Sequence, residues 1–382
     1  MHFINFFFFN IGKVFKGKIL VIDRYVPNFD KDAGGRCTYM YLKLFKELGL
    51  KVTFLGADFE NPEPYTTILQ KEGINVLYGD FYRNNITNWF KINLKNFQYV
   101  YLQRPEIAQD YLDIIRNYSS GKIFYFGHDL HYIRLLREFN ITNNNETKQQ
   151  SEIMKKIEFE IFSKVDVIHV VGNYEQKILK EQFKEKPIRN IPIFIYGQNL
   201  INIEKDFSKR KDLIFVGGFS HLPNVDAINW FHEYVFPKII ETFPDIVLHI
   251  AGSNIPIEIQ NLQSKNIIIE GYLTEKNLSS LYQKCRISIA PIRFGAGVKG
   301  KIIEAAFNQI PMVTTTIGAE GLDHSMEVFL IEDDAEKMAK SICELYINFS
   351  KLKKMSDSGA IFIEKYFSMK KAKEEIMKDL NC

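Results

Sequence analysis

The chain has 382 residues, of which 46% are hydrophobic and 25% charged, a length and balance that suit two globular domains. Its 49 lysines and arginines against 46 aspartates and glutamates give a net charge of only +3, and the interspersed charges argue against a nucleic-acid-binding protein. Cys37, Cys285, Cys343 and Cys382 have no paired spacing, so we expect neither a zinc site nor a disulfide framework, and a reducing cytoplasm fits best.

The N-terminal run from Phe3 to Phe9 is unusually apolar. It is far shorter than the about 20 residues that a membrane-spanning helix needs. We interpret it as an additional N-terminal segment or an early start. A shallow peripheral contact with the inner face of a membrane is the alternative.

The first half of the chain alternates strand and helix patterns. Apolar, β-branched runs bounded by Gly, Pro or Asp predict strands at residues 18–23, 52–55, 75–77, 99–102, 123–126 and 167–170. Between them lie amphipathic patterns such as residues 39–48, which end at Gly49 as a helix C-terminal cap. Strands that alternate with helices pair in parallel, so this half is predicted to be a doubly wound α/β domain.

The second half repeats the pattern after a polar stretch at residues 198–211. Its strands are predicted at residues 213–216, 247–251, 267–270, 287–290, 312–315 and 328–331. We therefore expect an N-terminal domain at residues 1–204 and a second domain from residue 205. Ligands bind outside the carboxyl ends of the strands in such sheets, so a cleft between the two domains is the expected site.

The loop after the first predicted strand contains Gly34, Gly35 and Arg36, just before a helix. The glycines would let a substrate approach a helix N-terminus, although such turns also serve plain chain reversal. Asp30 and Asp32 are spaced like a metal-binding pair. No third ligand is suggested, so we favour a helix cap and predict no metal site.

Residues 123–126 lead into His128 and Asp129, at the carboxyl end of a predicted strand. Either side chain could orient or polarise a substrate hydroxyl or accept a proton. The alternative is that Asp129 caps an amphipathic helix at residues 132–138. The polar residues 140–150 beyond it are expected to form a mobile segment.

Three shorter signals follow strands of the second half. Gly217 and Gly218 would allow backbone contact with a phosphate or a sugar. Tyr272 follows the strand at 267–270, where a nucleobase could rest. Arg293 follows the strand at 287–290 and could pair with a phosphate, although an arginine at a strand end is equally ordinary on a surface.

The most informative stretch combines a glycine-rich turn with the start of a helix. The turn comprises Gly295, Ala296, Gly297 and Val298, and the helix start carries Lys299, Lys301 and Glu304. Backbone N–H groups at a helix N-terminus, close approach at glycine and two lysines suit a nucleotide diphosphate. Glu304 lies about one turn into the helix, where a carboxylate could accept two hydrogen bonds from a ribose diol.

The same glycines match the dinucleotide fingerprint of dehydrogenases, with Glu320 as its acid. That fingerprint belongs to the first strand and helix of its fold, whereas at least three predicted strands of this half precede it. Glu320 also falls in a turn beyond the next strand. We therefore interpret the match as coincidental.

Taken together, these motifs resemble retaining glycosyltransferases of family 4, which have the GT-B fold of two Rossmann-like domains. Residues 33–35 resemble the opening of the acceptor domain, and residues 215–219 with 223–227 resemble the start of the donor domain. The most specific match is the stretch 295–301 with Glu304 and residues 315–322. Residues 362–377 resemble the family's final helix, which crosses back to the first domain. The donor domain would then end at residue 364, and residues 365–382 would form that crossing helix.

The resemblance implies transfer of a sugar from a nucleotide-diphosphate sugar to a saccharide or lipid-linked acceptor, with retention and without a metal or other cofactor. It suggests cell-surface polysaccharide or glycoconjugate synthesis in the cytoplasm. It assigns Glu304 to the donor ribose and the loop at 295–298 to the sugar and diphosphate. Many members carry a glutamate where this chain has Ala296, and an Arg and a Lys where it has Gly218 and Phe219. Lys299, Lys301 and Arg293 are the expected replacements for that positive charge.

Two other classes remain open. A GT-B sugar-nucleotide epimerase would share the fold and the ligand but transfer nothing to an acceptor. A catalytically silent binder of sugar nucleotide is the second, and the missing carboxylate at Ala296 speaks for it.

Overall fold

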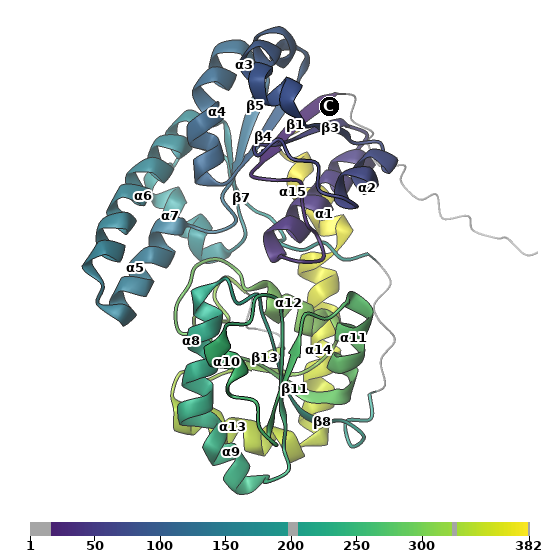
Figure 1. Ribbon diagram of the computed structural model, residues 1–382, viewed down its shortest axis with the longest axis vertical. Coiled ribbons are helices and arrows are strands. Elements are labelled where there is room, and N and C mark those ends of the chain that lie inside the picture. The colour runs from purple at the N-terminus through teal and green to yellow at the C-terminus, as the bar shows by residue number, and fades with distance from the viewer. Residues whose placement is uncertain (1–16, 198–204, 323–326, 381–382) are drawn as a thin grey trace, which may run out of the picture.

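The computed structural model describes residues 17–197, 205–322 and 327–380, which form two α/β domains joined end to end (Figure 1). The apolar run from Phe3 to Phe9 and part of the polar stretch 198–211 lie outside the described residues. Two doubly wound parallel sheets were the predicted fold class, and that prediction is confirmed.

The first domain is built on a seven-stranded, all-parallel sheet with the order β3-β2-β1-β4-β5-β6-β7. Its strands are β1 (Lys18–Asp23), β2 (Lys51–Gly56), β3 (Asn75–Leu77), β4 (Tyr99–Gln103), β5 (Lys122–Phe126), β6 (Val167–Val170) and β7 (Ile188–Asn190). Its helices are α1 (Ala33–Glu47), α2 (Tyr65–Lys71), α3 (Asp80–Asn93), η1 (Leu94–Asn96), α4 (Pro105–Tyr118), α5 (His131–Thr142), α6 (Asn145–Lys164) and α7 (Asn173–Gln182).

The second domain is built on a six-stranded, all-parallel sheet with the order β10-β9-β8-β11-β12-β13. Its strands are β8 (Lys211–Val216), β9 (Leu248–Ala251), β10 (Ile267–Gly271), β11 (Cys285–Ala290), β12 (Met312–Thr314) and β13 (Phe329–Ile331). The helices of the second domain are α8 (Leu222–Trp230), η2 (Phe231–Val235), α9 (Phe236–Thr242), α10 (Ile257–Gln260), α11 (Glu275–Lys284), α12 (Gly300–Phe307), α13 (Ala335–Ile347) and α14 (Phe349–Phe367), and the last helix, α15 (Met369–Met377), returns to the first domain.

The central strands are buried on both faces because helices cover each sheet on both sides. In β1, every residue from Ile19 to Asp23 is buried, and alternate side chains join two different apolar clusters. One cluster lies under α1, α2 and α15, and it continues through Phe194 and Tyr196 into the second domain. The other lies under α3, α4 and α6. The two domains therefore share a continuous apolar contact.

Two elements differ from the sequence-based expectation. The short strand β7 is absent from the predicted strands, because Ile188 is the only apolar residue of its three. Residues 140–150 do not form a mobile loop: α5 ends at Asn143, which adopts a left-handed conformation with φ 53°, and α6 begins two residues later. The side chain of Asn144 accepts a hydrogen bond from the backbone N–H of Glu146 and so caps α6.

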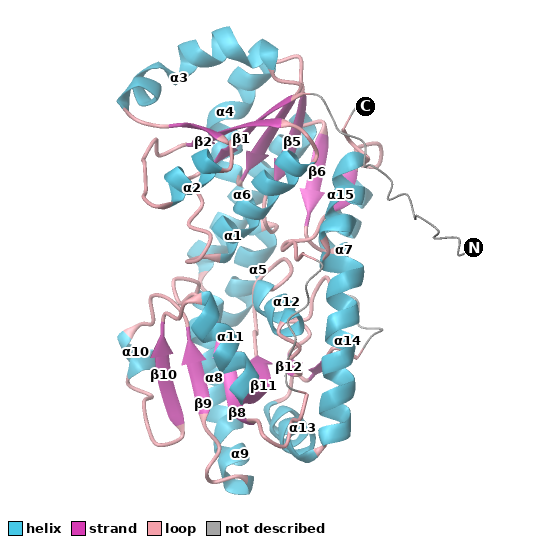
Figure 2. Cartoon of the chain, turned by 90° about the vertical axis from the view of Figure 1, so that its right-hand side faces the viewer, coloured by secondary structure: helices cyan, strands magenta, loops and turns pink. Residues whose placement is uncertain are grey.

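The chain crosses between the domains twice, and the two crossings lie side by side. The N–H of Tyr196 donates to the carbonyl of Phe367 at 2.8 Å, and the N–H of Met369 donates to the carbonyl of Tyr196 at 3.1 Å. Beyond this point α15 packs on the first domain (Figure 2), where Arg189 forms a bidentate ion pair with Asp379. The chain thus begins and ends on the same domain over its described residues.

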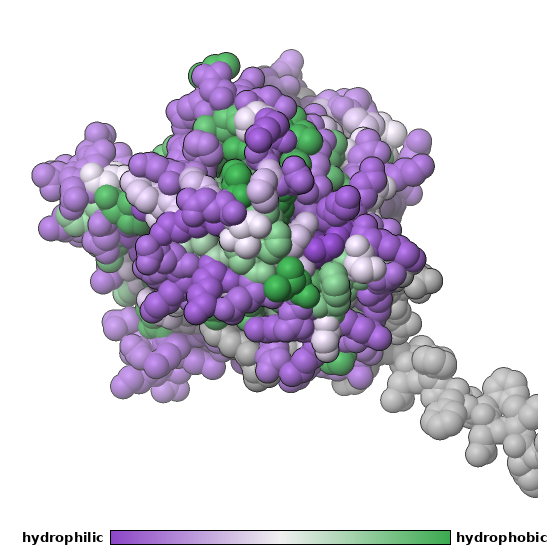
Figure 3. Space-filling view, turned by 90° about the horizontal axis from the view of Figure 1, so that it is seen from below, coloured by the Kyte–Doolittle hydropathy of each residue, from purple (hydrophilic) through white to green (hydrophobic). Residues whose placement is uncertain are grey.

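Among the described helices, none is both long and apolar enough to cross a membrane. Figure 3 views the molecule from the end formed by the second domain, and this face is mostly hydrophilic with scattered hydrophobic residues. The segment from Phe3 to Phe9, for which a membrane contact was the alternative interpretation, lies outside the described residues.

Candidate active site between the two domains

The glycine-rich turn of the second domain lies directly against the first domain. The carbonyl of Gly295 accepts a hydrogen bond from Arg137 Nη1 at 2.7 Å, and Ala296 packs against the apolar cluster under α3, α4 and α6. A Cβ at Gly297, where φ is 67°, would lie only 3.0 Å from Cβ of Asp129 and 3.2 Å from the carbonyl oxygen of His128. Only glycine allows this approach. The structure therefore brings together the turn at 295–298 and residues 128–129, which the sequence predicted separately.

Helix α12 starts at Gly300, and both predicted lysines lie at its N-terminus. Lys299 Nζ donates to the carbonyl of Gly297 at 2.6 Å. Lys301 Nζ hydrogen-bonds to Asn224 Oδ1 and lies 4.2 Å from the centre of the Phe215 ring, beside Gly217 at the end of β8. Burial lowers the pKa of Lys299 to about 8, and burial together with the charge of Lys299 lowers the pKa of Lys301 to about 7. Two closely spaced, partly desolvated cations at a helix N-terminus favour an anion.

Glu304 makes an ion pair with a residue of the first domain. Its Oε1 accepts from Arg36 Nη1 at 2.8 Å, and both side chains are largely buried. The Arg36 guanidinium also lies over the rings of Phe194 and Tyr196, at 5.0 and 5.8 Å. The residue predicted to face the acceptor and the residue predicted to hold the donor ribose are therefore direct partners.

The other predicted donor-side residues lie around this centre. The carbonyl of Gly218 accepts from Asn224 Nδ2 at 2.6 Å, next to the Lys301 side chain. Arg293 forms an ion pair with Asp226 of α8, with Nε 2.9 Å from Oδ2. Tyr272 is half exposed, and its hydroxyl contacts Asp30 of the first domain. Arg293 thus has a protein partner, while Gly217 lies beside the Lys301 ammonium and Gly218 is hydrogen-bonded to Asn224.

His128 follows β5 in a left-handed conformation with φ 68°, and its ring centre lies 4.4 Å from that of Phe126, with the two ring planes tilted by 37°. Its Nε2 lies 2.9 Å from Oε1 of Gln103 at the end of β4. Burial and then the charge of Arg104 lower the pKa of His128 to about 3, so the ring is neutral at physiological pH. Such a strained backbone in a residue without glycine's freedom is typical of functional positions.

Asp129 does not cap the following helix, as the alternative interpretation expected. Helix α5 has Leu130 at its N-cap position, and Asp129 pairs instead with His131 Nε2 at 3.0 Å and Arg134 Nε at 2.9 Å. Burial alone would raise the pKa of Asp129, but Arg134 and His131 lower it, so its carboxylate is charged. Asp129 therefore orients His131 and Arg134 beside the glycine-rich turn.

The backbone N–H groups at the start of α5 donate to two buried acids from neighbouring helices. Glu158 of α6 accepts from the N–H groups of His131 and Tyr132 at 2.9 and 3.0 Å, and Glu175 of α7 accepts from Leu130 at 3.0 Å. Burial raises the pKa of Glu158 to about 7 and that of Glu175 to about 8. Two acids far away in the sequence thus fix the segment that carries His128.

The carboxyl ends of β1 and β4 add an ion pair that the sequence did not reveal. Arg104 Nε donates to Asp23 Oδ1 at 2.6 Å, and Arg104 also has a left-handed backbone, with φ 68°. A Cβ at Gly34 would lie 2.8 Å from Arg104 Nη2, so the glycine leaves room for this guanidinium. At the start of α1, Asp32 accepts from the N–H of Gly35 at 2.7 Å, which confirms the predicted helix cap.

Sequence reasoning also missed the role of Glu320. Its carboxylate forms a bidentate pair with Arg137 of α5, with distances of 2.7 and 2.6 Å. This ion pair and the Arg36–Glu304 pair hold the two domains together around the glycine-rich turn. For Asp23, Gln103 and Arg104, the sequence did contain a signal of a functional site: all three stand at the carboxyl ends of predicted strands.

A family model described as Glycosyl transferases group 1 matches residues 210–348, which span the second sheet. The chain is also 30% identical over 177 residues to an uncharacterised 44.6 kDa protein from the cps region of Klebsiella pneumoniae. That alignment covers 44% of this chain and 45% of the relative, so the chain matches less than half the length of that protein.

Several solved structures share the whole architecture. TarM of S. aureus, as a mutant in complex with fondaparinux, α-GlcNAc-glycerol and UDP, has a TM-score of 0.71 at 12% identity, covering 95% of this chain and 99% of that chain. Sucrose-phosphate synthase of Thermosynechococcus elongatus has a TM-score of 0.70 at 12% identity, with 95% and 98% covered. HepE of Anabaena in complex with UDP and glucose has a TM-score of 0.66 at 12% identity, with the same coverage. The chain therefore has the GT-B fold, and its residues 210–348 match a Glycosyl transferases group 1 domain.

Proposed function

We propose that the protein is a retaining glycosyltransferase of family 4. It would transfer a sugar, such as a hexose, from a nucleotide-diphosphate sugar to a saccharide or lipid-linked acceptor. Three comparisons support this proposal: the group 1 match over the second domain, the UDP found in TarM and HepE, and the relative from a cps region. The last favours a role in surface polysaccharide or glycoconjugate synthesis. We place the enzyme in the cytoplasm, where a peripheral contact at the inner face of the membrane would bring it to a lipid-linked acceptor.

The observation that carries the proposal is the meeting of three features in one place. The N-terminus of α12 and two partly desolvated lysines lie on the second domain, while His128 lies across from them on the first. A helix N-terminus with buried cations stabilises a departing diphosphate, and the opposite domain holds the acceptor hydroxyl for attack from the same face. In this scheme residues 1–204 bind the acceptor, residues 205–364 bind the donor, and residues 365–382 return to the first domain.

The side chains divide into three groups by task. Lys299 and Lys301 neutralise the diphosphate in place of a metal ion, and Glu304 holds the donor ribose. The turn at 295–298, together with Gly217, Gly218, Tyr272 and Arg293, surrounds the rest of the donor. His128 and Asp129 orient the reacting groups, and residues 34–36 face the acceptor.

A panel of nucleotide-diphosphate sugars, scored by release of nucleoside diphosphate and by mass spectrometry of added acceptors, tests this function. A glycosylated acceptor together with diphosphate release supports it. An epimerised donor without transfer would instead identify an epimerase, and tight donor binding without either product would identify a silent binder. The same assay with a chelator tests whether a metal is needed.

Binding of the nucleoside diphosphate should take up protons at mildly alkaline pH. At pH 8.5 the free protein holds Lys299 and Lys301 mostly neutral, because their pKa values are about 8 and 7. A bound diphosphate favours the charged ammonium and raises both pKa values, so about one proton or more should be taken up per ligand. Affinity should therefore fall as the pH rises from 7 to 9.

Calorimetry in two buffers of different ionisation enthalpy measures this uptake. The ligand is fully ionised at pH 8.5, so it does not contribute a proton of its own. The variant Lys301→Met should take up fewer protons than the wild type. Binding with no proton exchange at this pH would contradict the placement of the diphosphate beside these lysines.

A further inference from the structure

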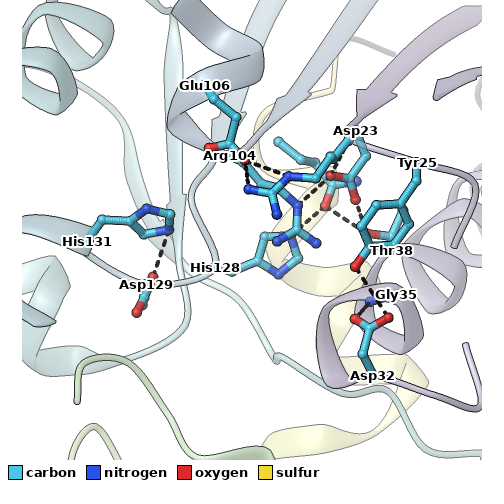
Figure 4. Close-up of polar contacts among 12 residues, drawn as sticks. Asp23, Tyr25, Asp32, Gly35, Thr38, Arg104, Glu106, His128, Asp129 and His131 are labelled. Carbon is cyan, nitrogen blue, oxygen red and sulfur yellow. Dashed lines mark hydrogen bonds and ion pairs between the residues drawn. The ribbon is translucent and has the colours of Figure 1, made fainter. Parts of the chain in front are cut away.

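A row of buried polar side chains connects Asp23 to His128 (Figure 4). Asp23, Thr38 and Gln103 are each at most 1% exposed. Thr38 Oγ1 lies 2.8 Å from Asp23 Oδ2 and 3.0 Å from Oε1 of Gln103, and that same amide atom lies 2.9 Å from Nε2 of His128. Two atoms at the end of this row have no partner: Nε2 of Gln103 and Nδ1 of His128.

Asp23 determines which atom donates and which accepts in each hydrogen bond of this row. Burial alone would raise the pKa of Asp23, but the adjacent Arg104 lowers it, so the carboxylate is charged and its oxygens only accept. Oδ1 already accepts from Arg104 Nε and from the N–H of Arg24. The single hydroxyl proton of Thr38 is therefore used on Oδ2, and Thr38 Oγ1 can only accept from its other neighbour.

This fixes the orientation of the Gln103 amide, whose oxygen and nitrogen are assigned from the hydrogen bonds they make. With Oε1 toward Thr38, two oxygens face each other without a proton between them, and the NH₂ group is buried without a partner. An unmade hydrogen bond of this kind is unfavourable. With the amide turned by 180°, one N–H donates to Thr38 Oγ1 and the other to Nε2 of His128, and only the amide oxygen is left without a partner. The turned orientation is therefore the favoured one.

The same hydrogen-bond argument applies to the imidazole of His128. His128 accepts at Nε2, and a neutral ring carries its one proton on the other nitrogen. We propose that Asp23, through Thr38 and Gln103, fixes His128 as the Nδ1–H tautomer, so that His128 meets the substrate as a hydrogen-bond donor and not as a proton acceptor. Thr38 and Gln103 are then positioning residues. The tautomer is a property of the protein alone, whereas its role in sugar transfer rests on the proposed function.

The proton on Nδ1 of His128 determines which kind of ligand group can bind there. A buried Nδ1–H without a partner needs an acceptor, such as a hydroxyl oxygen of the sugar or of the acceptor molecule. It cannot deprotonate the attacking hydroxyl.

Nitrogen NMR of the ¹⁵N-labelled protein without donor tests the tautomer directly. Long-range proton correlations distinguish Nε2, which couples strongly to both ring C–H protons, from Nδ1, and the variant His128→Asn identifies the resonance. We expect Nε2 to have the chemical shift of a bare ring nitrogen at pH 7. A protonated Nε2 in the wild type would overturn the proposal, whatever reaction the protein catalyses.

Two variants test the connection to Asp23. Thr38→Val removes the hydrogen bond that orients the Gln103 amide, so we expect both tautomers of His128 to be populated. Turnover should then fall about tenfold, with donor affinity little changed. Gln103→Glu places an accepting oxygen at Nε2, so the proton should move there. Thr66→Val, at an equally buried threonine of α2, should change neither property. An unchanged Nδ1–H in both Thr38→Val and Gln103→Glu would show that the row does not set the tautomer.

Discussion

Replacing Lys301 with methionine should lower kcat/KM for sugar transfer by about 30-fold to 1000-fold, or about 2–4 kcal/mol of transition-state stabilisation. The ammonium lies beside Gly217 at the end of β8 and at the N-terminus of α12, where the diphosphate is proposed to leave. Methionine keeps the packing of the side chain over Phe215 but removes the charge. Initial rates with the donor found in the panel measure the effect.

Lys299 should matter less for this step. Its ammonium is influenced by the negative charges of Glu320 and Asp129, which also repel a diphosphate. We therefore expect Lys299→Met to lower kcat/KM by less than Lys301→Met does, and Lys340→Met, on the exposed face of α13, to have no effect. Activity lost on chelation and restored by magnesium, with both lysine variants active, would show that a metal does the work assigned here to lysine.

Loss of fold cannot explain the expected result for Lys301. The lysine pKa is lowered in the folded protein, so the unfolded chain holds this proton more tightly between about pH 7 and its ordinary pKa. Lys301 therefore costs stability, either because it gives up its proton on folding above about pH 7 or because it buries its charge below that pH. Methionine removes this unfavourable term, so the melting temperature of Lys301→Met should not fall.

The variant Glu304→Ala should weaken binding of the nucleoside diphosphate by about 1.5–3 kcal/mol, the range for hydrogen bonds to a charged group. Glu304 lies one turn into α12, and its Oε1 is engaged by Arg36. A carboxylate oxygen has room for further hydrogen bonds, and its second oxygen remains for the ribose diol. Titration calorimetry of the wild type and the variant gives the difference.

The effect on affinity of losing the Arg36–Glu304 ion pair has to be separated from the effect of losing the hydrogen bonds to the ribose. The variant Arg36→Ala removes the pair and keeps the carboxylate, so its affinity should change by less than about 1 kcal/mol. In the double variant the deficit of Glu304→Ala should persist. A 2′,3′-dideoxy ligand offers no diol, so wild type and Glu304→Ala should bind it equally well. Equal affinity of both proteins for the ribose ligand would remove Glu304 from the donor site.

The fold could be predicted from the sequence because its main signal is local. Strands buried on both faces have apolar, β-branched sequences, and twelve of the thirteen strands among the described residues overlap such runs. Strand β7 was missed because Arg189 and Asn190 make up two of its three residues. Its place in the sheet comes from pairing with β6, which no local pattern records.

The site could be predicted only as far as single strand ends indicate it. His128, Lys301 and Glu304 were predicted as site residues because each follows a strand or a glycine turn. Their partners depend on tertiary packing: Arg36 is 268 residues away from Glu304, and Arg137 is 183 residues away from Glu320. The Glu320 carboxylate stands in a turn whose sequence gives no sign of a functional site. Only the docking of α5 on that turn gives it a partner.

We expect the paired crossings at Tyr196 and Met369 to limit how the two domains move relative to each other. Two chain segments that are hydrogen-bonded to each other favour rotation about this point, since a sliding movement would break both bonds. Tyr196 is also stacked on Phe307 at 4.0 Å, close to this point. Helix α5 lies on the opposite side of the molecule (Figure 1), where the ion pair between Arg137 and Glu320 joins the domains. We expect the domains to rotate apart when this ion pair breaks, so that the proposed nucleotide sugar enters from the side of α5.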